Sequence, residues 1–387
     1  MARSYWTARF AWRALAVPLV LTGALTGPWQ AAAAPGSTCQ SWTFGQPPSP
    51  GSVDNELNGV AVLSACDAWA AGTTRSGSGA SQTLIEHWDG SSWTVVPSPS
   101  PGTTGNGLAS VRAGSPTDIW AVGVFSNNSV DQTLILHWNG TAWQQVPSPS
   151  PGSAFSELSA VRAVSASDAW AVGDYSDGSG SNQTLILHWN GTVWKKVPSP
   201  NPGPFSFLAD VAATSASNAW AAGELGTPLG DRTLILHWNG VTWARVPSPS
   251  PGASDDLTGV AATSASSAWA AGFTSGGSAQ ALILHWDGTK WARMASPAPG
   301  PGISTLLNGV AASSTRSALA VGFSETSTTE QGLILRWDGT AWKQVPAPSP
   351  GTLSTLSAVG TTSASSAWAV GRFSTTVVGQ ALAIRCC

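Results

Sequence analysis

Two arginines in the 387-residue chain have the type and spacing to bind an anion. Arg112 and Arg162 occupy the same place in neighbouring copies of an internal repeat, where other copies have Ala212, Ala261 or Ala311. A guanidinium presents a planar fork of N–H donors that matches a carboxylate. We predict that both side chains point toward a central channel and form part of a ligand site. The alternative is two solvated arginines.

Aromatic side chains are a second set of candidate ligand-binding residues. They recur one or two positions after a glycine that ends the second strand of several copies, so they could stack on sugar rings or anchor a protein partner. They could also pack beneath their own loops. These residues are Phe125, Tyr175, Phe273, Phe323 and Phe373.

Catalysis and metal binding have little support in the sequence. No Gly-x-Ser-x-Gly, His-Glu-x-x-His or phosphate-binding glycine loop occurs. A recurrent turn aspartate, as in Asp67, Asp118 and Asp168, becomes Asn218 or Ser267 in later copies, which a turn cap tolerates and a pair of catalytic carboxylates does not. We therefore predict no catalytic residue and no cofactor.

The histidines also recur at one repeat position. Equivalent residues on separate copies cannot converge on a metal, and two copies have arginine there, which favours a structural role and no metal site. The residues at this position are His87, His137, His188, His237 and His285, with Arg336 and Arg385.

All these residues belong to a repeat of about 50 residues, typical of architectures in which one unit packs on the next. The last copy stops at Cys387, before the segment that ends every other copy, and residues 39–51 match that missing segment. A chain that completes its last unit with its own beginning indicates a closed ring. The copies begin near residues 57, 108, 158, 208, 257, 307 and 356.

Each copy is typical of four antiparallel strands. In the third copy, apolar runs at 158–163, 169–173, 184–189 and 192–197 are separated by polar turns, and Asn190-Gly191 indicates a type I′ hairpin. The proline-rich stretch that follows fits the end of an edge strand. These features predict an all-β, seven-bladed β-propeller of four-stranded antiparallel blades, with the last blade closed by the N-terminal strand.

Three tryptophans recur per copy, as in Trp120, Trp138 and Trp143. Their fixed strand positions favour packing between blades over sugar stacking. The sixth copy has Leu319 where others have tryptophan, a replacement that a core accepts and a stacking site does not.

The first residues are typical of an export signal. Arg3, Arg9 and Arg13 precede an apolar run at 14–25 and small residues at 31–34. That run is too short for a membrane anchor, which needs about 20 apolar residues. We expect residues 1–33 to be a signal peptide and residues 34–387 to be a secreted, monomeric propeller.

The charge of the mature chain excludes two classes of partner. Without residues 1–33 it has 14 basic and 20 acidic residues, a net charge of −6. Nucleic acids and anionic membranes select basic surfaces.

The four cysteines lie near the joint of the expected ring, and in an oxidising compartment they predict disulfides. Cys39–Cys387 would bridge the break, leaving Cys66–Cys386. The alternative is Cys39–Cys386 with Cys66–Cys387, and the sequence does not choose between them.

The whole mature chain resembles secreted bacterial propellers with Kelch-like or Asp-box-like repeats. Val122-Gly123 after the second strand and Asn139-Gly140 before Trp143 carry the resemblance. One glycine stands where a Kelch blade has two, and Asn139 directly precedes Gly140, whereas an Asp box has its aspartate two residues before the glycine. The resemblance therefore implies the propeller fold but no sialidase activity.

Loop variation locates the expected function. The turns after the first and third strands are nearly uniform, whereas the loops at 73–77, 174–177 and 224–228 differ, as binding loops on a constant scaffold do. We expect an exported, non-enzymatic binding propeller whose ligand on the variable-loop face is an extracellular or cell-wall polysaccharide (a carbohydrate) or a protein. The alternatives are a polysaccharide hydrolase or lyase that uses Arg112, Arg162, Asp174 and Asp231, and a purely structural scaffold.

Overall fold

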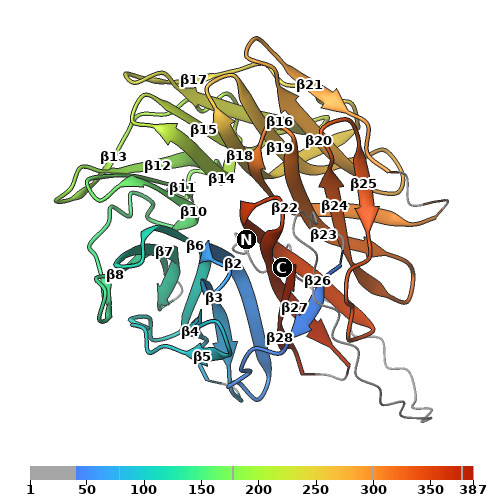
Figure 1. Ribbon diagram of the computed structural model, residues 1–387. Helices are drawn as coiled ribbons and strands as arrows, with labels where there is room; N and C mark the ends of the chain where they lie inside the picture. The colour runs from blue at the N-terminus through green and yellow to red at the C-terminus, as the bar shows by residue number, and fades with distance from the viewer. Residues whose placement is uncertain are drawn as a thin grey trace, which may run out of the picture. The chain divides into compact units, whose positions relative to one another are not determined.

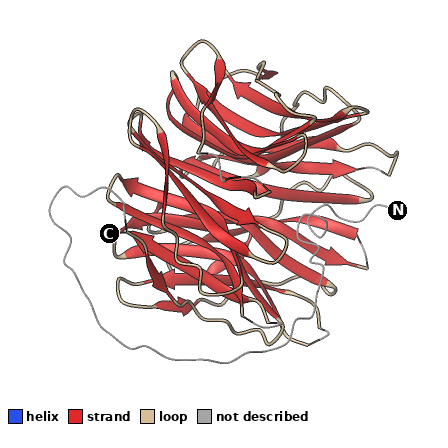
Figure 2. Ribbon diagram, turned by 90° about the vertical axis from the view of Figure 1, so that its right-hand side faces the viewer, coloured by secondary structure: helices blue, strands red, loops and turns tan. Residues whose placement is uncertain are grey.

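The computed structural model describes residues 41–386, apart from 78, 129, 177, 298, 299, 301, 376 and 377. The expected signal peptide, Cys39 and Cys387 lie outside the described residues. Within them, every regular element is a β-strand, as Figure 2 shows. The described part of the chain has no helix long and apolar enough to cross a membrane.

The strands form successive four-stranded antiparallel groups, and the first strand of each group lies nearest the centre (Figure 1). Three groups are separate sheets, and the other strands form two larger sheets in which a short parallel bridge joins neighbouring groups. The groups consist of β2 (Asp54–Ser64), β3 (Asp67–Arg75), β4 (Gln82–Trp88) and β5 (Trp93–Val95); β6 (Gly105–Ser115), β7 (Asp118–Asn127), β8 (Val130–Trp138) and β9 (Trp143–Gln145); β10 (Phe155–Ser165), β11 (Asp168–Ser176), β12 (Gln183–Trp189) and β13 (Trp194–Lys196); β14 (Phe205–Ser215), β15 (Asn218–Thr227), β16 (Gly230–Trp238) and β17 (Trp243–Arg245); β18 (Ser254–Ser264), β19 (Ser267–Ser275), β20 (Gln280–Trp286) and β21 (Trp291–Met294); β22 (Ser304–Ser314), β23 (Ser317–Glu325), β24 (Glu330–Trp337) and β25 (Trp342–Val345); and β26 (Leu353–Ser363), β27 (Ser366–Ser374) and β28 (Gln380–Cys386) with β1 (Thr43–Gly45).

The last group takes its outer strand from the start of the chain. β1 runs antiparallel to β28, with Thr43 opposite Arg385 and Phe44 opposite Ile384. The innermost strands contact one another in order, from β2 and β6 through to β22 and β26, and β26 contacts β2. The two ends of the described chain therefore lie in one sheet.

The hairpin between the third and fourth strands differs from the expected type I′ turn. Positive φ falls on the glycine alone, as at Gly140 with φ of 94°, and not on the preceding Asn139. Asn139 and Ala142 face each other across the hairpin, so Gly140 and Thr141 are its two central residues. Glycine at the first central position matches a type II′ turn. The Asn139 side chain accepts hydrogen bonds from the N–H groups of Thr141 and Ala142, both at 3.0 Å, and so caps the turn.

The Ser-Pro connectors are held by a buried threonine on the third strand. Thr133 Oγ1 is hydrogen-bonded to Ser148 Oγ at 2.7 Å and to Ser150 Oγ at 3.0 Å, and Ser150 Oγ also accepts the Thr133 N–H. The serine hydroxyl thus accepts the strand N–H, and the threonine hydroxyl bonds to a connector whose prolines have no N–H of their own. The same hydrogen bond between a strand threonine and a connector serine forms at Thr83, Thr184 and Thr233. In the other groups the threonine is replaced by Ala281, Gly332 and Ala381.

Tryptophans form the contacts between groups, in agreement with the packing interpretation. The Trp120 ring on β7 lies 5.1 Å from Trp189 and 5.2 Å from Trp194 of the next group. Leu319 is buried in one cluster with Trp42. The same contact with the following group joins Trp69 to Trp138 and Trp143, Trp170 to Trp238 and Trp243, Trp220 to Trp286 and Trp291, Trp269 to Trp337 and Trp342, and Trp368 to Trp88 and Trp93.

The cysteine predictions need a correction, because both pairings placed Cys66 in a disulfide. Cys66 is a free, exposed thiol in the turn between β2 and β3. Cys386 is buried opposite Ala367 in the cluster that contains Trp42, and it is disulfide-bonded to a partner outside the described residues.

If β1 acts as an ordinary outer strand, Trp42 should stabilise the protein as its counterparts do. Trp42→Ala and Trp143→Ala should each lower the free energy of unfolding by about 3–5 kcal/mol, because each deletes a buried indole. Urea denaturation of the mature chain measures both. A loss below about 0.5 kcal/mol for Trp42→Ala alone would contradict the pairing of the two chain ends.

Candidate functional site

Two opposite faces carry different kinds of connection. On what we call the hairpin face, the turn between the first two strands touches the hairpin of the last two: a Cβ added to Gly140 would lie 3.0 Å from Thr117, and one added to Gly191 would lie 3.0 Å from Ser167. The opposite, loop face carries the loops between second and third strands, such as 228–229, and the connectors between groups, such as 197–204. Antiparallel order places these two sets of connections at opposite strand ends.

The two arginines lie on adjacent innermost strands, near the hairpin face. Arg112 on β6 is opposite Trp120, and Arg162 on β10 is opposite Trp170, so they share one register position. Arg112 Nη1 donates to the carbonyls of Val60 and Val111, both at 3.0 Å. Arg162 has no hydrogen bond to any described residue, and its Nε is buried without an acceptor. Both side chains remain partly exposed.

Asp210 on β14 completes this charged group. Its Oδ1 accepts the Val211 N–H at 2.8 Å, and its Oδ2 accepts the Val260 N–H of β18 at 2.9 Å. Burial raises the pKa of Asp210, while the positive charges of Arg112 and Arg162 act to lower it. Burial lowers the pKa of Arg162, the charge of Arg112 lowers it further, and Asp210 opposes both effects. The three side chains therefore interact electrostatically.

Sequence reasoning missed Asp210, although a signal was present. Asp210 lies two residues before Ala212, the counterpart of Arg112, at a register position where other copies have only small residues. A single carboxylate in that series marks a departure from the repeat. The small residues at this position are Gly59, Ser110, Ala160, Gly259, Gly309 and Ala358.

The acids expected to work with these arginines lie elsewhere. Asp174 pairs with Glu157 near the loop face, four residues along β11 from the partner of Arg162, which corresponds to about 13 Å. Asp231 on β16 accepts a hydrogen bond from Ser254 Oγ at 2.9 Å and lies at the loop end of its strand. The structure does not bring these acids and the arginines together.

The candidate aromatics do not form one surface. Tyr175 and Phe373 are buried, and Phe125 packs against a core cluster. Phe273 and Phe323 sit one residue after the glycine rather than two, so they point to the other side of their sheets. Tyr175, Phe373 and Phe125 therefore pack against core residues, whereas Phe273 and Phe323 are only partly buried.

Tyr175 illustrates this packing. Its hydroxyl lies 2.6 Å from Gln183 Oε1 and 2.6 Å from Lys196 Nζ, and the lysine ammonium also lies 4.0 Å from the ring centre. The ring is thus enclosed by side chains of its own group and is not presented to a ligand.

The histidines form a repeated local contact. His137 Nε2 lies 2.7 Å from Asp118 Oδ1, and its ring stacks on Trp120 at 4.1 Å. The same contact recurs with Asp67, Asp168 and Asn218, so each histidine supports its own turn. Within the described ranges, no three His, Cys, Asp or Glu side chains converge in a way that could hold a metal ion.

Exposed apolar side chains gather on the loop face of the fourth group. Leu229, in the loop between β15 and β16, is 83% exposed, and Phe205 at the start of β14 is 39% exposed. Phe205 pairs with Gly226, three residues before Leu229. Val130 on the same face is 37% exposed. Such side chains, raised on a loop, are suited to contact a partner.

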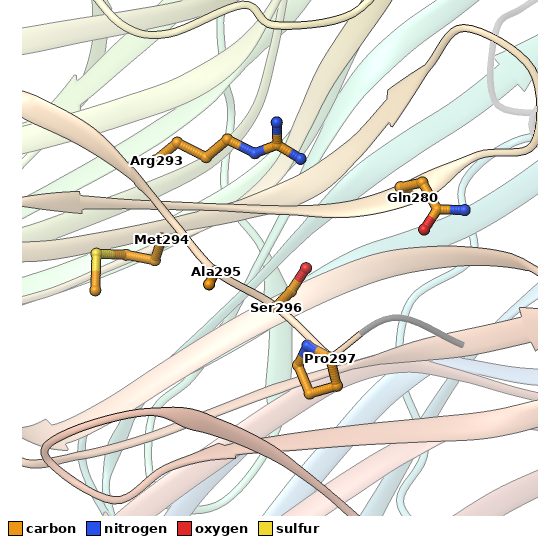
Figure 3. A pocket seen from close by; sticks show the side chains of 6 residues that line it. All are labelled: Gln280, Arg293, Met294, Ala295, Ser296 and Pro297. Carbon is orange, nitrogen blue, oxygen red and sulfur yellow. The ribbon is translucent and has the colours of Figure 1, made fainter. Parts of the chain in front are cut away.

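A hollow of about 410 Å³ lies at the outer edge of the fifth group, between β20, β21 and the following connector. Figure 3 shows Gln280, Arg293 and Met294 among its lining side chains. Here Ala281 stands where other groups have the threonine that bonds to the connector serine, and Ser296 Oγ donates to the Ala281 carbonyl at 3.1 Å. The hollow therefore lies in a group that lacks the hydrogen bond between a strand threonine and the connector serine.

Two glutamates are buried without a counter-charge. Glu86 on β4 is fully buried, and neither carboxyl oxygen has a partner. The other groups have leucine there, as at Leu136, or isoleucine in β28. It shares one side of β4 with Leu84 and Trp88, which pack against Trp368. Burial raises the pKa of Glu86 to about 8. Burial, with the charges of Asp174 and Asp131, raises the pKa of Glu157 to about 9.

These carboxyls should make the protein less stable as the pH rises. The folded chain retains protons that the unfolded chain releases above its ordinary value of 4.5, so the free energy of unfolding falls between pH 5 and pH 8.5. Thermal unfolding of the mature chain should give a higher Tm at pH 5. Glu86→Leu should raise stability at pH 8.5 by about 1–4 kcal/mol and flatten the dependence, because a buried polar group is replaced by packing atoms.

The control for this experiment is Gln145→Leu, which changes an exposed, uncharged residue of β9 to the same side chain and should leave the slope unaltered. A Tm that rises steadily from pH 5 to pH 8.5, or a Glu86→Leu protein no more stable than the native one, would contradict the assignment.

No family model and no curated protein matches the chain. Solved structures do. YCF48 bound to a D1 peptide is similar with a TM-score of 0.55 and 14% identity, over 89% of this chain and 96% of that one. The WD40 β-propeller domain of Doa1 gives a TM-score of 0.54 at 11% identity, over 89% and 96%. The GH74 xyloglucanase from Xanthomonas campestris gives 0.54 at 13%, over 87% of this chain and 54% of the enzyme. These likenesses identify the fold as a β-propeller.

Proposed function

We propose that the chain is an exported, monomeric, non-enzymatic β-propeller that binds a protein partner through its loop face. Export is supported by the signal-like composition of residues 1–33. A bound peptide on a structurally similar propeller, YCF48, is compatible with a protein ligand.

The scaffold in this proposal is a closed ring of seven blades. The pairing of β1 with β28, the contact of β26 with β2, and the packing of Trp368 against Trp88 and Trp93 support closure between the last and first blades. Closure protects the inner edges of the sheets and fixes the loops in position.

The observation that carries the protein-binding proposal is the apolar projection of the fourth blade. Leu229 is 83% exposed on a loop that begins and ends at paired strand residues, Thr227 and Gly230. Exposed leucine and phenylalanine side chains contribute to protein contacts by burying apolar area. A polysaccharide site would instead need a platform of exposed rings, whereas Tyr175 and Phe373 are buried and Phe125 packs against a core cluster.

A hydrolase or lyase is less well supported. The arginines near the hairpin face and the acids near the loop face are separated along their strands, so they do not form a single site for acid–base catalysis.

The proposal is tested by partner capture with two matched variants. The mature chain, immobilised, is offered secreted proteins of the source culture and, in parallel, a glycan array. Leu229→Ser with Phe205→Ser should reduce captured protein at least about tenfold, because the contact loses its apolar area. Val241→Ser should have no effect, since Val241 is equally prominent at 78% exposure but lies in a turn on the hairpin face.

Capture that the Leu229/Phe205 variant retains in full, or binding to the glycan array alone, would contradict a protein partner at the loop face. No capture by either route would favour a purely structural ring.

A further inference from the structure

Positive charge is concentrated where the innermost strands β6, β10 and β14 run side by side. Arg112 and Arg162 share a register position whose counterparts in the other groups are all small. Only Asp210 adds a charge at the neighbouring position. Whether or not Asp210 is ionised, two guanidiniums against one carboxyl leave this region positive. The small counterparts of the arginines are Ala61, Ala212, Ala261, Ala311 and Gly360.

The three groups do not neutralise one another by direct pairing. Among the described residues, neither arginine forms an ion pair with Asp210, whose two oxygens accept backbone N–H groups of Val211 and Val260. Arg112 donates to two neutral carbonyls. Arg162 has no acceptor, although its Nε is buried. Holding a guanidinium in a poorly solvated place without a partner is unfavourable, and an added anion would offset that cost.

The geometry suits a carboxylate in particular. A guanidinium binds a planar carboxylate through two parallel N–H···O bonds, and two adjacent guanidiniums can share its oxygens.

We infer that Arg112 and Arg162 together bind one carboxylate group between the innermost strands β6 and β10. The site lies toward the hairpin face and is separate from the loop face, so it does not depend on the proposed protein partner.

Isothermal titration of the mature chain with butyrate tests the site, with neutral butyramide of similar shape as the control ligand. Butyrate should bind saturably and butyramide should not. Arg112→Ala and Arg162→Ala should each weaken butyrate binding about tenfold or more, because each removes charged hydrogen bonds. Arg245→Ala, which removes an exposed arginine of β17, should leave the affinity unchanged.

A further variant distinguishes the loss of butyrate binding from misfolding. Arg162→Lys keeps the charge but loses the fork, so it should bind butyrate more weakly than the native chain while it unfolds at a similar temperature. Circular dichroism and Tm establish that each variant is folded.

The source of the carboxylate is distinguished by two blocked tripeptides, acetyl-Ala-Glu-Ala-amide and its glutamine counterpart. Displacement of butyrate by the glutamate peptide alone supports an acidic side chain of a protein, and displacement by neither supports a small free acid. No saturable butyrate binding, equal binding of butyramide, or an equal loss in Arg245→Ala would overturn the inference. The Leu229/Phe205 variant should bind butyrate normally, so failure of the loop-face proposal is recognised separately.

Discussion

The structure depends on one contact between successive repeats: the tryptophan of a second strand lies between two tryptophans of the next repeat. Trp120, for example, is 1% exposed and has ring centres of Trp189 and Trp194 within 5.2 Å. A single four-stranded sheet cannot cover such a ring, so each repeat needs its neighbour to complete its core. Trp368 makes this contact with Trp88 and Trp93 of the first group, so the last repeat packs against the first.

Outside this tryptophan contact, single copies depart from the residue types common to the repeat. Several of these departures introduce a charged side chain. Asp210 replaces a small residue, Arg112 and Arg162 replace alanines, and Glu86 replaces a leucine. Glu86 destabilises the core, since its carboxyl oxygens have no partner. The two arginines and Asp210 instead gather charge on three adjacent innermost strands, where a ligand can offset the cost.

The sequence predicted the propeller architecture because its period, turn residues and strand patterns are local and recur in every copy. It predicted the packing role of tryptophan for the same reason. It did not predict that Asn139 would cap its turn, because the choice between I′ and II′ depends on backbone angles. It placed Cys66 in a disulfide because spacing along a chain does not reveal which sulfur lies on an exposed turn. Arg112 and Arg162 as ligand-binding residues stay a prediction of the sequence, and Asp210 was not part of it, because Asp210 approaches them only through the arrangement of three neighbouring groups of strands.

The central claim, that each repeat is stabilised by the next and the first by the last, is tested most directly by hydrogen exchange in Trp368→Ala. The account predicts faster amide exchange in β27 and β28 and also in β4 and β5, which are more than 270 residues away in sequence but hold Trp88 and Trp93. Faster exchange confined to β26–β28, with β4 and β5 protected as in the native chain, would contradict it.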